Sequence, residues 1–393
     1  MKKVYLDRIA ATPLHPEALE AMRPFLGEAY GNPQSLHSAG RQALEAVEAA
    51  REEVAGLVGA QSSEIYFASS GTEANNFAVK GLALGQQARG RHVVVSAIEH
   101  SSVLNSVKAL EKQGFSATVV PVDRSGRVDP ADVEKALTKE TVLVSVMTAN
   151  SEVGTIQPVA AVAAVCRPRG ILVHTDAVAA AGSVPLDVKA LGVDALSLAG
   201  DQFYGPKGTA ALFVRKGVRI LPLIDGGIQE SGRRGGTENV AGIVGMGRAA
   251  RLALREMEAM TRTLVPLRDR LLEELPVRAG HVIVTGSRTE RLPYHASFCI
   301  EFVEGESMLL SLDMKGVAVS SGSACTSKAL KASHVLLAMG LDHAIAQGSL
   351  VFSLIDGTSA GDVDYVLDVF PPVVERLRRM SPLYTQYLKE RGS

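Results

Sequence analysis

The sequence has no excess of charge of either sign, no long apolar run and few cysteines, and each lack excludes a class of protein. Its 41 basic and 42 acidic side chains give a net charge of −1, and no block of like charge points to nucleic acid or to an anionic membrane. No apolar stretch reaches the roughly 20 residues that a spanning helix needs. The N-terminus lacks the apolar core of a signal peptide. We therefore expect a cytoplasmic protein with neither a membrane nor a nucleic-acid partner.

The three cysteines, Cys166, Cys299 and Cys325, lie far apart and lack metal-finger spacing. An odd number of widely spaced cysteines suits a reducing compartment, with at most one thiol doing chemistry. Cys166 and Cys299 have apolar neighbours in the sequence, as structural cysteines usually do. Cys325 lies instead in a run of small polar residues, 320–327, which is typical of a nucleophile or a sulfur carrier. Cys325 is therefore the one candidate functional thiol.

Apolar strand-like runs alternate with helical patterns through the first two thirds of the chain. Most of these runs are continuous rather than alternating, as expected of strands that helices cover on both faces. This order predicts an α/β protein with a mainly parallel, doubly wound sheet. The strands are expected at 65–67, 92–95, 117–120, 141–146, 171–174, 195–197 and 210–214.

A smaller C-terminal α+β domain is expected, because 393 residues exceed the usual size of one domain. A long helical pattern over 239–274 leads into it, and strand candidates follow at 281–284 and 296–302. We assign residues 15–252 to a large cofactor-binding domain, and residues 1–14 and 253–393 to a small domain that carries the Cys325 loop.

Candidate ligand-binding residues follow the strands, because ligands of open parallel sheets bind at the carboxyl ends of the strands. Gly71 and Thr72 form a small-residue turn that opens a helix, which suits a phosphate or is an ordinary capped turn. His100 can stack on a flat ring or move protons, although a lone histidine there is more often structural. Asp176 can hold a protonated pyridine nitrogen or can cap a turn.

Ten motifs follow one another along essentially the whole chain: Tyr5–Asp7, Tyr30–Pro33, Ser69–Glu73, Glu99–His100, Glu152–Pro158, Tyr204–Gly208, Arg234–Thr237, Glu304–Ser307, the Cys325 loop and Ser381–Tyr384. Together and in this order, these motifs resemble those of the cysteine desulfurases of iron–sulfur cluster assembly. The resemblance implies a class V aminotransferase-like, fold type I pyridoxal-phosphate homodimer with active sites at the subunit interface.

The resemblance implies a role for each matching residue. His100 stacks on the pyridine ring and also counts as a candidate catalytic residue, and Asp176 pairs with the ring nitrogen. Contacts to the cofactor come from Gly71, Thr72, Asn150, the residue at position 202, and Thr237 of the partner subunit.

For Cys325, the resemblance implies attack on the sulfur of L-cysteine, which leaves a persulfide on Cys325 and releases alanine. The tail, 381–384, resembles the region where an iron–sulfur scaffold protein docks.

Gln202 departs from the family pattern, which has the Schiff-base lysine at this position. The family reads Ser-Gly-His-Lys where this chain reads Ala199-Gly200-Asp201-Gln202. A primary amide can neither form that covalent link nor act as the amine base that moves the α-proton. If Asp201 points toward the cofactor phosphate, two charges about 5 Å apart repel by roughly 3 kcal/mol at an effective dielectric of 20.

Other losses cluster in the same site. Val351 stands where the family has the arginine that grips the substrate carboxylate, ideally through a bidentate pair. Ala179 replaces a glutamine near the cofactor oxygen, and Ser151 follows Asn150 where the family has a second asparagine. Residues 355–356 read Ile-Asp in place of Gly-Arg. The Cys325 loop and the tail are kept.

These residues predict a cysteine desulfurase-like protein of sulfur mobilisation in which Cys325 forms the persulfide and cysteine cleavage is weakened or lost. Pyridoxal phosphate, if bound, is non-covalent. The alternative is a non-catalytic partner that presents Cys325 as a sulfur acceptor, or as one ligand of an iron–sulfur cluster shared with the scaffold protein, because one thiolate cannot hold a cluster. A third hypothesis is a reshaped pocket for another small molecule, with Asp201 and Gln202 lining it.

Overall fold

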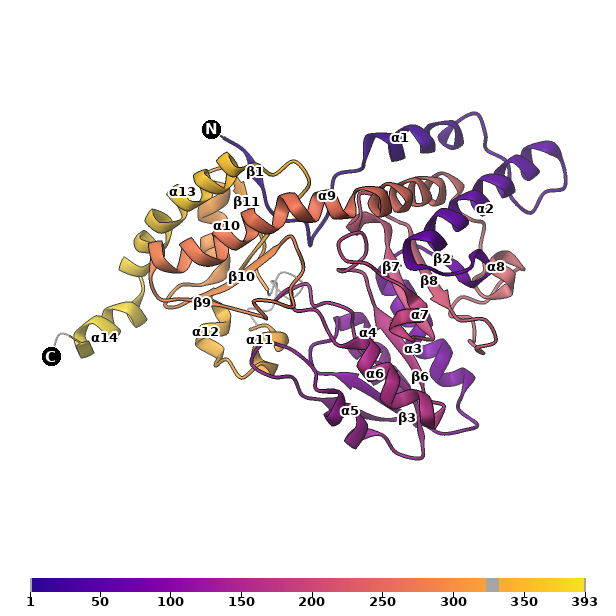
Figure 1. Cartoon of the computed structure of the whole chain (residues 1–393), viewed down its shortest axis with the longest axis horizontal. Coiled ribbons are helices and arrows are strands. Elements are labelled where there is room, and N and C mark those ends of the chain that lie inside the picture. The colour runs from indigo at the N-terminus through magenta and orange to yellow at the C-terminus, as the bar shows by residue number, and fades with distance from the viewer. Residues whose placement is uncertain (1, 323–331, 392–393) are drawn as a thin grey trace.

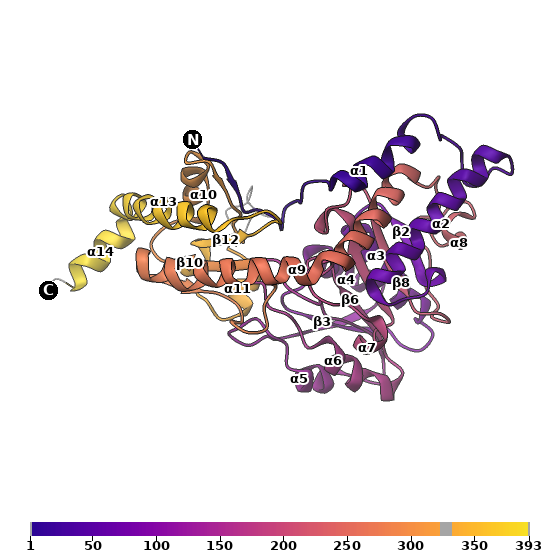
Figure 2. The ribbon, with the colours of Figure 1, turned by 45° about the horizontal axis from the view of Figure 1, so that its top comes forward.

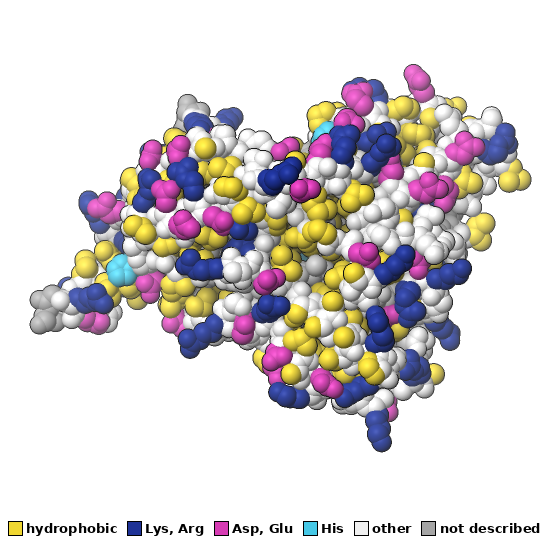
Figure 3. Space-filling view, in the orientation of Figure 1, with side chains coloured by type: hydrophobic (Ala, Val, Ile, Leu, Met, Phe, Trp, Pro, Cys, Tyr) yellow, Lys and Arg dark blue, Asp and Glu magenta, His cyan; other side chains and the backbone are white. Residues whose placement is uncertain are grey.

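The computed structural model describes residues 2–322 and 332–391. A large α/β part and a smaller C-terminal part lie side by side, joined by one long helix, α9 (Val240–Ala279) (Figure 1). The view in Figure 2 also shows α9 running between the two parts. Acidic and basic side chains are interspersed over the face seen in Figure 3, without a patch of one sign.

The large part is built on a seven-stranded sheet with the order β2-β8-β7-β6-β5-β3-β4. Six of the strands are buried along their whole length and only the edge strand β4 is partly exposed, which explains their continuous apolar sequences. The prediction of seven strands in a mainly parallel sheet is confirmed. The strands are β2 (Ile65–Ala68), β3 (His92–Ser96), β4 (Ser116–Val120), β5 (Thr141–Ser145), β6 (Leu172–Asp176), β7 (Ala195–Ala199) and β8 (Ala210–Val214).

Strand β8 is the exception, because it runs antiparallel to both of its neighbours, β7 and β2. The connection from β7 to β8, residues 200–209, is too short for the crossover that a parallel neighbour requires. This connection begins with the single turn η4 (Gly200–Gln202) directly after β7. Gln202 therefore lies at the carboxyl end of β7.

Two apolar cores cover the two faces of the sheet. Successive strand residues face opposite sides, so Phe67 of β2 packs into one core and Tyr66 into the other. The helices α2, α6 and α9 build the first core, and α3 and α4 build the second. The helices of this part are α1 (Pro16–Met22), α2 (Ser38–Val58), α3 (Gly71–Gly85), α4 (Ser101–Glu111), α5 (Pro130–Ala136), α6 (Val159–Cys166), α7 (Val188–Leu191) and α8 (Gln229–Gly232).

The smaller part holds an antiparallel sheet of β9 (Val282–Val284), β10 (His295–Ile300) and β12 (Ser349–Ser353), with β10 in the middle. The first residues of the chain belong here, because β1 (Val4–Tyr5) pairs with β11 (Val317–Ala318). Its helices are α10 (Gly305–Asp313), α11 (His334–Ala338), α12 (His343–Gln347), α13 (Ala360–Arg379) and α14 (Pro382–Arg391).

The expected boundary at residues 252 and 253 falls inside α9, which continues through it without a loop. One end of α9 packs against α1 and α2, and the other end packs against α13, β9 and β10. Within the described ranges, none of the helices is both long and apolar enough to cross a bilayer.

A buried ion pair ties the outer helix α2 to the edge of the sheet. The Arg51 guanidinium binds both carboxylate oxygens of Glu230, at 2.7 and 2.8 Å. Arg51 also donates to the carbonyl of Ile65, and Glu230 accepts from the N–H of Phe67, so both ends of the pair contact the backbone of β2. Both side chains are nearly inaccessible to solvent.

Replacing Glu230 with glutamine should destabilise the fold strongly, because it removes the buried anion of Arg51 and leaves only the half-exposed Glu48, 3.1 Å from its Nε. Losing one partner of a buried pair typically costs about 3 kcal/mol or more, measurable as the free energy of unfolding in urea at fixed protein concentration. The matched control is Glu20→Gln, which breaks the exposed pair with Arg23 and should leave the unfolding midpoint unchanged. Equal midpoints for the two variants would contradict the structural role of the buried pair.

Candidate active site

A cavity of about 320 Å³ opens at the carboxyl ends of β6 and β7. Five of the seven predicted cofactor-binding residues line it: Gly71, Thr72, His100, Asp176 and Gln202. Four sequence-distant segments therefore meet in one place, as the parallel topology predicts.

The N-terminus of α3 forms one wall of this cavity. Ser70 caps the helix by accepting a hydrogen bond from the N–H of Glu73, which leaves the first N–H groups of the helix directed at the cavity. Gly71 permits a close approach, because a Cβ there would lie 2.8 Å from Val178. Glu73 itself is held by Arg234 at 2.9 Å. The wall thus combines free donors with the positive end of the helix dipole.

Asp176 lies at the floor of the cavity, at the end of β6. Its side chain accepts hydrogen bonds from Asn75 Nδ2 at 2.6 Å and from the N–H of Val178 at 2.9 Å. Burial raises the pKa of Asp176, and the nearby His100 opposes that rise. Both donors are neutral, so a cation arriving in the cavity would stabilise the carboxylate.

Asn75 links Asp176 to His100, a role that is not apparent from the sequence. The two N–H groups of its amide go to Asp176 and to the Ser102 hydroxyl, the latter at 2.9 Å. Ser102 in turn contacts His100 Nδ1 through its hydroxyl at 2.7 Å and its N–H at 3.2 Å. A backbone N–H can only donate, so Nδ1 is the acceptor, and the neutral ring carries its proton on Nε2.

Gln202 lines the cavity with an amide that is already engaged. Its Nε2 donates to the carbonyl of Ile9 at 3.3 Å, and the backbone carbonyl of Gln202 accepts from Arg8 at 3.4 Å. Lys207 does not line the cavity, although its neighbour Gly208 does. In the part of the chain that the structure describes, the cavity is lined by neither lysine nor arginine.

Asp201 also lines the cavity, beside the N-terminus of α3. Burial raises the pKa of its carboxyl, and Lys207 opposes this effect. Its backbone carbonyl accepts from both the N–H and the hydroxyl of Thr12, which fixes the segment. The carboxyl therefore lies on the same cavity as the helix end that suits an anion.

Asn150 lies behind the cavity rather than on its wall. Its Oδ1 accepts from the N–H groups of Glu152 and Val153, and its Nδ2 donates to the carbonyl of Ile98. The next residue, Ser151, lines the cavity in its place. The asparagine thus shapes the loop, and the serine faces the ligand space.

The remaining predicted site residues lie elsewhere. Thr237 is exposed in the loop before α9 and does not line the cavity of its own chain. Cys325 lies outside the described residues. Val351 is buried in β12 and pairs through its backbone with Ser320. Cys166 and Cys299 are buried, as predicted, and burial raises the pKa of each thiol to about 12.

Glu99 is a buried carboxyl close to the cavity that carries no assigned role in the sequence interpretation. One oxygen accepts from the Ser96 hydroxyl and from the N–H of Met147, which lines the cavity. The other oxygen is buried with no partner among the described residues. Burial raises the pKa of Glu99 to about 8, and the charge of Asp176 adds to the rise.

The comparisons with known proteins agree with this geometry. Residues 4–366 match the family model described as aminotransferase class V. Cysteine desulfurase IscS of Dictyoglomus turgidum is 49% identical over 381 residues, which cover 97% of each chain. Cysteine desulfurase IscS of Methanosarcina thermophila is 48% identical over 97% of this chain and 94% of that protein.

Solved structures share the fold as well. A NifS-like protein matches with a TM-score of 0.90 and 38% identity, over 96% of this chain and 100% of its own. A NifS-like protein from Rickettsia africae matches with a TM-score of 0.86 and 30% identity, over 95% and 100% of the two chains. This chain therefore belongs to the class V aminotransferase family of pyridoxal-phosphate enzymes. Within that family it is a member of the cysteine desulfurase group, which confirms the resemblance.

Pyridoxal phosphate is the cofactor that this family implies, and the cavity has groups that suit its ring and its phosphate. The buried Asp176 lacks a cation, and Asn75 Oδ1 is a buried acceptor without a donor among the described residues. The α3 end offers donors to a phosphate. The covalent anchor has no counterpart, because the cavity has Gln202 and no lysine, and Ala179 lines the cavity where the resemblance implies a glutamine.

Asp201 should make cofactor affinity depend on pH. Because its pKa is raised, its negative charge is lost as the pH falls through that value, and repulsion of the phosphate is lost with it. Binding of pyridoxal phosphate, followed by absorbance, should therefore tighten as the pH falls through the pKa of Asp201, which lies above the ordinary aspartate value of about 4. Asp201→Asn should bind on the order of a hundredfold more tightly at pH 8 and depend less on pH.

The matched control is Asp313→Asn, an exposed position on α10, which should bind and titrate like the wild type. The phosphate and the ring titrate equally in all three proteins, so the difference between them isolates Asp201. Identical affinities for wild type and Asp201→Asn at pH 8 would show that the carboxylate does not face the phosphate.

Proposed function

We propose that this protein is a cysteine desulfurase homologue of sulfur mobilisation that holds pyridoxal phosphate without a covalent link. Cys325 is its sulfur-carrying thiol, and its cleavage of L-cysteine is slow or lost. The observation that carries the proposal is a cavity with the ring-binding and phosphate-binding groups of the family but no lysine. Relatives named cysteine desulfurase, at 45–49% identity, support the sulfur-mobilisation role.

Four residues of this chain would hold the cofactor. The Gly71 and Thr72 N–H groups would receive the phosphate, His100 would lie against the ring, and Asp176 would pair with the ring nitrogen. When bound, pyridoxal phosphate supplies an electron sink for bonds at the substrate α-carbon. Asn75 holds Asp176 and, through Ser102, His100, so the ring-facing groups are positioned together.

Proton transfer from the substrate is the step that this cavity is least equipped to catalyse. His100 presents a donor to the cavity, because its Nδ1 is occupied by Ser102. The side-chain anions at the cavity are Asp176, which is engaged by Asn75 and Val178, and Asp201. An amide at Gln202 cannot accept a proton from the substrate α-carbon, so we expect that step to be slow.

We expect the site to bind the substrate weakly as well, because it lacks a cation for the substrate carboxylate. The described lining offers no arginine or lysine to a substrate carboxylate, and Val351 replaces the family arginine with an apolar side chain. A bidentate arginine–carboxylate pair is among the stronger contacts that a site can make. We therefore expect poor affinity for L-cysteine in addition to slow turnover.

The wider assembly is part of the same proposal. We propose a homodimer in which Thr237 of one subunit completes the phosphate site of the other, since Thr237 is exposed and does not line its own cavity.

The acceptor of the sulfur would be an iron–sulfur scaffold protein docking near the C-terminal tail. A cluster shared with that scaffold would take its remaining ligands from the partner, because no three-ligand metal group occurs among the described residues.

Alanine release from L-cysteine tests the proposal. With added pyridoxal phosphate, the purified protein should release alanine far more slowly than a lysine-containing desulfurase, and Cys325→Ser should abolish what remains. Asp176→Ala should remove both the cofactor absorbance and the alanine. Fast release by the wild type would contradict the proposed weakening. No release above the Cys325→Ser level would favour the non-catalytic alternative, in which Cys325 only accepts sulfur.

The Gln202→Lys variant tests whether Gln202 alone limits the activity or whether Asp201 and Val351 limit it as well. The added amine should restore a covalent link to the cofactor but only a small part of the turnover, because Asp201 still repels the phosphate and Val351 still offers no charge. Gln202→Lys combined with Asp201→His and Val351→Arg should be faster than Gln202→Lys alone. A fully active single variant would show that Asp201 and Val351 matter little.

A further inference from the structure

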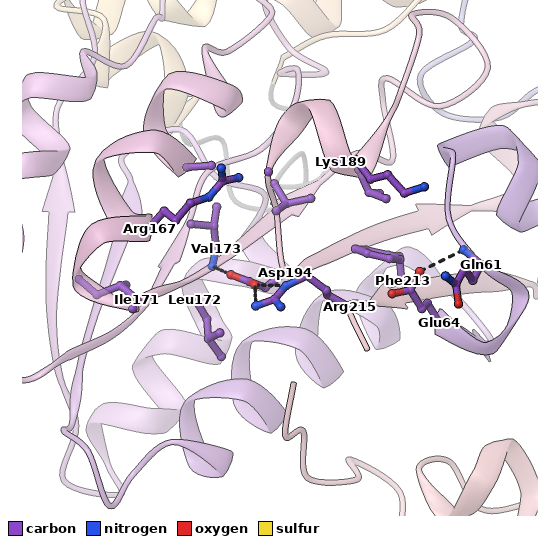
Figure 4. A pocket seen from close by; sticks show the side chains of 15 residues that line it. Gln61, Glu64, Arg167, Ile171, Leu172, Val173, Lys189, Asp194, Phe213 and Arg215 are labelled. Atoms are coloured by element: carbon purple, nitrogen blue, oxygen red, sulfur yellow. Dashed lines mark hydrogen bonds and ion pairs between the residues drawn. The ribbon is translucent and has the colours of Figure 1, made fainter. Parts of the chain in front are cut away.

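Charged side chains at several places in the fold have a partner of opposite charge. At the amino ends of β6 and β7, a second cavity of about 500 Å³ is lined by Asp194. Its carboxylate accepts from the N–H of Val173 at 2.8 Å and pairs with Arg215 at 2.6 Å, and Figure 4 draws both contacts as dashed lines. The buried Arg51 pairs with Glu230. A buried charge without such a partner therefore needs an explanation, because leaving it unpaired is costly.

Arg8, in the segment that follows β1, is a buried cation of this kind. The residue is 1% exposed and pairs with no carboxylate in the described ranges. Its Nη2 donates to the Ser183 hydroxyl at 2.8 Å and to the backbone carbonyl of Gln202 at 3.4 Å. Its Nη1 contacts the Tyr204 hydroxyl at 3.5 Å and the sulfur of Met260 at 3.4 Å. Only one of these four acceptors is a backbone carbonyl.

Two other buried arginines, Arg291 and Arg378, also pair with no carboxylate among the residues that the structure describes, but backbone carbonyls surround them. Arg291 donates to three carbonyls. Arg378 donates to four, three of which follow one another at the end of α9, where a helix carries partial negative charge. Arg8 has one carbonyl in place of three or four, so less of its charge is balanced by the protein.

Two tyrosine rings enclose the Arg8 guanidinium. It lies 4.2 Å from the ring centroid of Tyr294 and 5.3 Å from that of Tyr204, within the range of cation–π contacts. Burial raises the pKa of Tyr204, and the charge of Arg8 opposes that rise. The rings stabilise the cation but carry no negative charge that would cancel it.

The guanidinium lies directly behind the wall of the cofactor cavity. Gln202, whose backbone carbonyl accepts from Arg8, lines this cavity. The Tyr294 hydroxyl donates to the carbonyl of Ala179 at 2.7 Å, and Ala179 lines the cavity as well. Ile9, the residue after Arg8, is a third lining residue and accepts from the Gln202 amide. One layer of backbone therefore separates the positive charge from the ligand space.

We propose that Arg8, acting through the cavity wall rather than by contact, is the buried countercharge of the anionic cofactor. This inference rests on the proposed function. The described lining has two carboxyls, Asp176 and Asp201, and neither lysine nor arginine, whereas a phosphate monoester carries about −1.5 to −2 at pH 7. A cation fixed in the interior offsets part of that charge. Arg8 thus supplies from behind the wall a positive charge that a lysine at position 202 would supply within it.

Arg8→Gln and Arg8→Lys separate the charge from the hydrogen bonds, with binding of pyridoxal phosphate to the full-length protein followed by absorbance. Arg8→Gln should weaken binding on the order of tenfold, since a unit charge about 10 Å away at an effective dielectric of 20 changes the affinity for an anion by that order. Arg8→Lys keeps the charge and should stay within about threefold of the wild type. For pyridoxal, which lacks the phosphate, the loss in Arg8→Gln should be smaller.

The matched control is Arg378→Gln, which removes a buried, tyrosine-stacked cation none of whose partners lines the cavity. This variant should bind pyridoxal phosphate like the wild type. Thermal midpoints well above the temperature of the titration would verify that each variant is folded. The comparison of pyridoxal with pyridoxal phosphate is made within one protein, so a shared loss of folded protein cancels.

Four results would overturn the inference. Wild-type affinity in Arg8→Gln would exclude a role for the charge, and equal losses in Arg8→Gln and Arg8→Lys would assign the effect to the hydrogen bonds. Equal losses for pyridoxal and pyridoxal phosphate would contradict a countercharge, and an equal loss in Arg378→Gln would indicate a general effect of removing a buried cation. A wild-type protein without any cofactor absorbance would instead overturn the proposed function, and this inference with it.

Discussion

The carboxylate of Asp176 is buried at the carboxyl end of a central strand, and the arrangement of the site depends on how that burial is compensated. A buried carboxylate is costly unless hydrogen bonds or a cation stabilise it. Asn75 supplies one bond and the backbone of Val178 another. The second N–H of Asn75 then fixes Ser102, and Ser102 fixes His100. One amide from α3 thus sets the floor and one wall of the cavity.

The charge balance of that cavity distinguishes this chain from the family pattern. The lysine and the arginine expected by resemblance are replaced by Gln202 and Val351, and Asp201 adds a carboxyl whose pKa is raised by burial. What remains are two acids, one histidine and the helix end of α3. Such a site can hold a ring and a phosphate, but it has lost the amine that would move a proton and the cation that would hold a substrate carboxylate.

Much of the fold follows from the sequence, because strands buried on both faces leave continuous apolar runs and because parallel strands bring their ends together. The reversal of β8 was not predicted, although the short connection 200–209 requires it. Strand β12 was missed because its residues were interpreted only as a substrate-binding stretch. The helical pattern over 239–274 predicts most of α9, which continues to Ala279.

The site was less predictable, since side-chain pairing depends on segments far apart in the chain. Asn75 and Glu99 lie beside residues that the sequence singled out, yet their partners are Asp176 and Met147. Asn150 and Ser151 are neighbours in the sequence. The side chain of Asn150 binds the backbone of the following turn, and Ser151 lines the cavity. Sequence could indicate the region but not which side chain turns inward.

Trapping with borohydride tests the central claim most directly. The protein is incubated with pyridoxal phosphate, reduced, and then analysed by mass spectrometry for cofactor bound covalently to a lysine. We predict a protein that shows cofactor absorbance before gel filtration, loses it afterwards, and carries no site-specific lysine adduct. A stoichiometric adduct on one lysine, Lys207 above all, would contradict the account, because it would show that another amine has taken over the anchoring role.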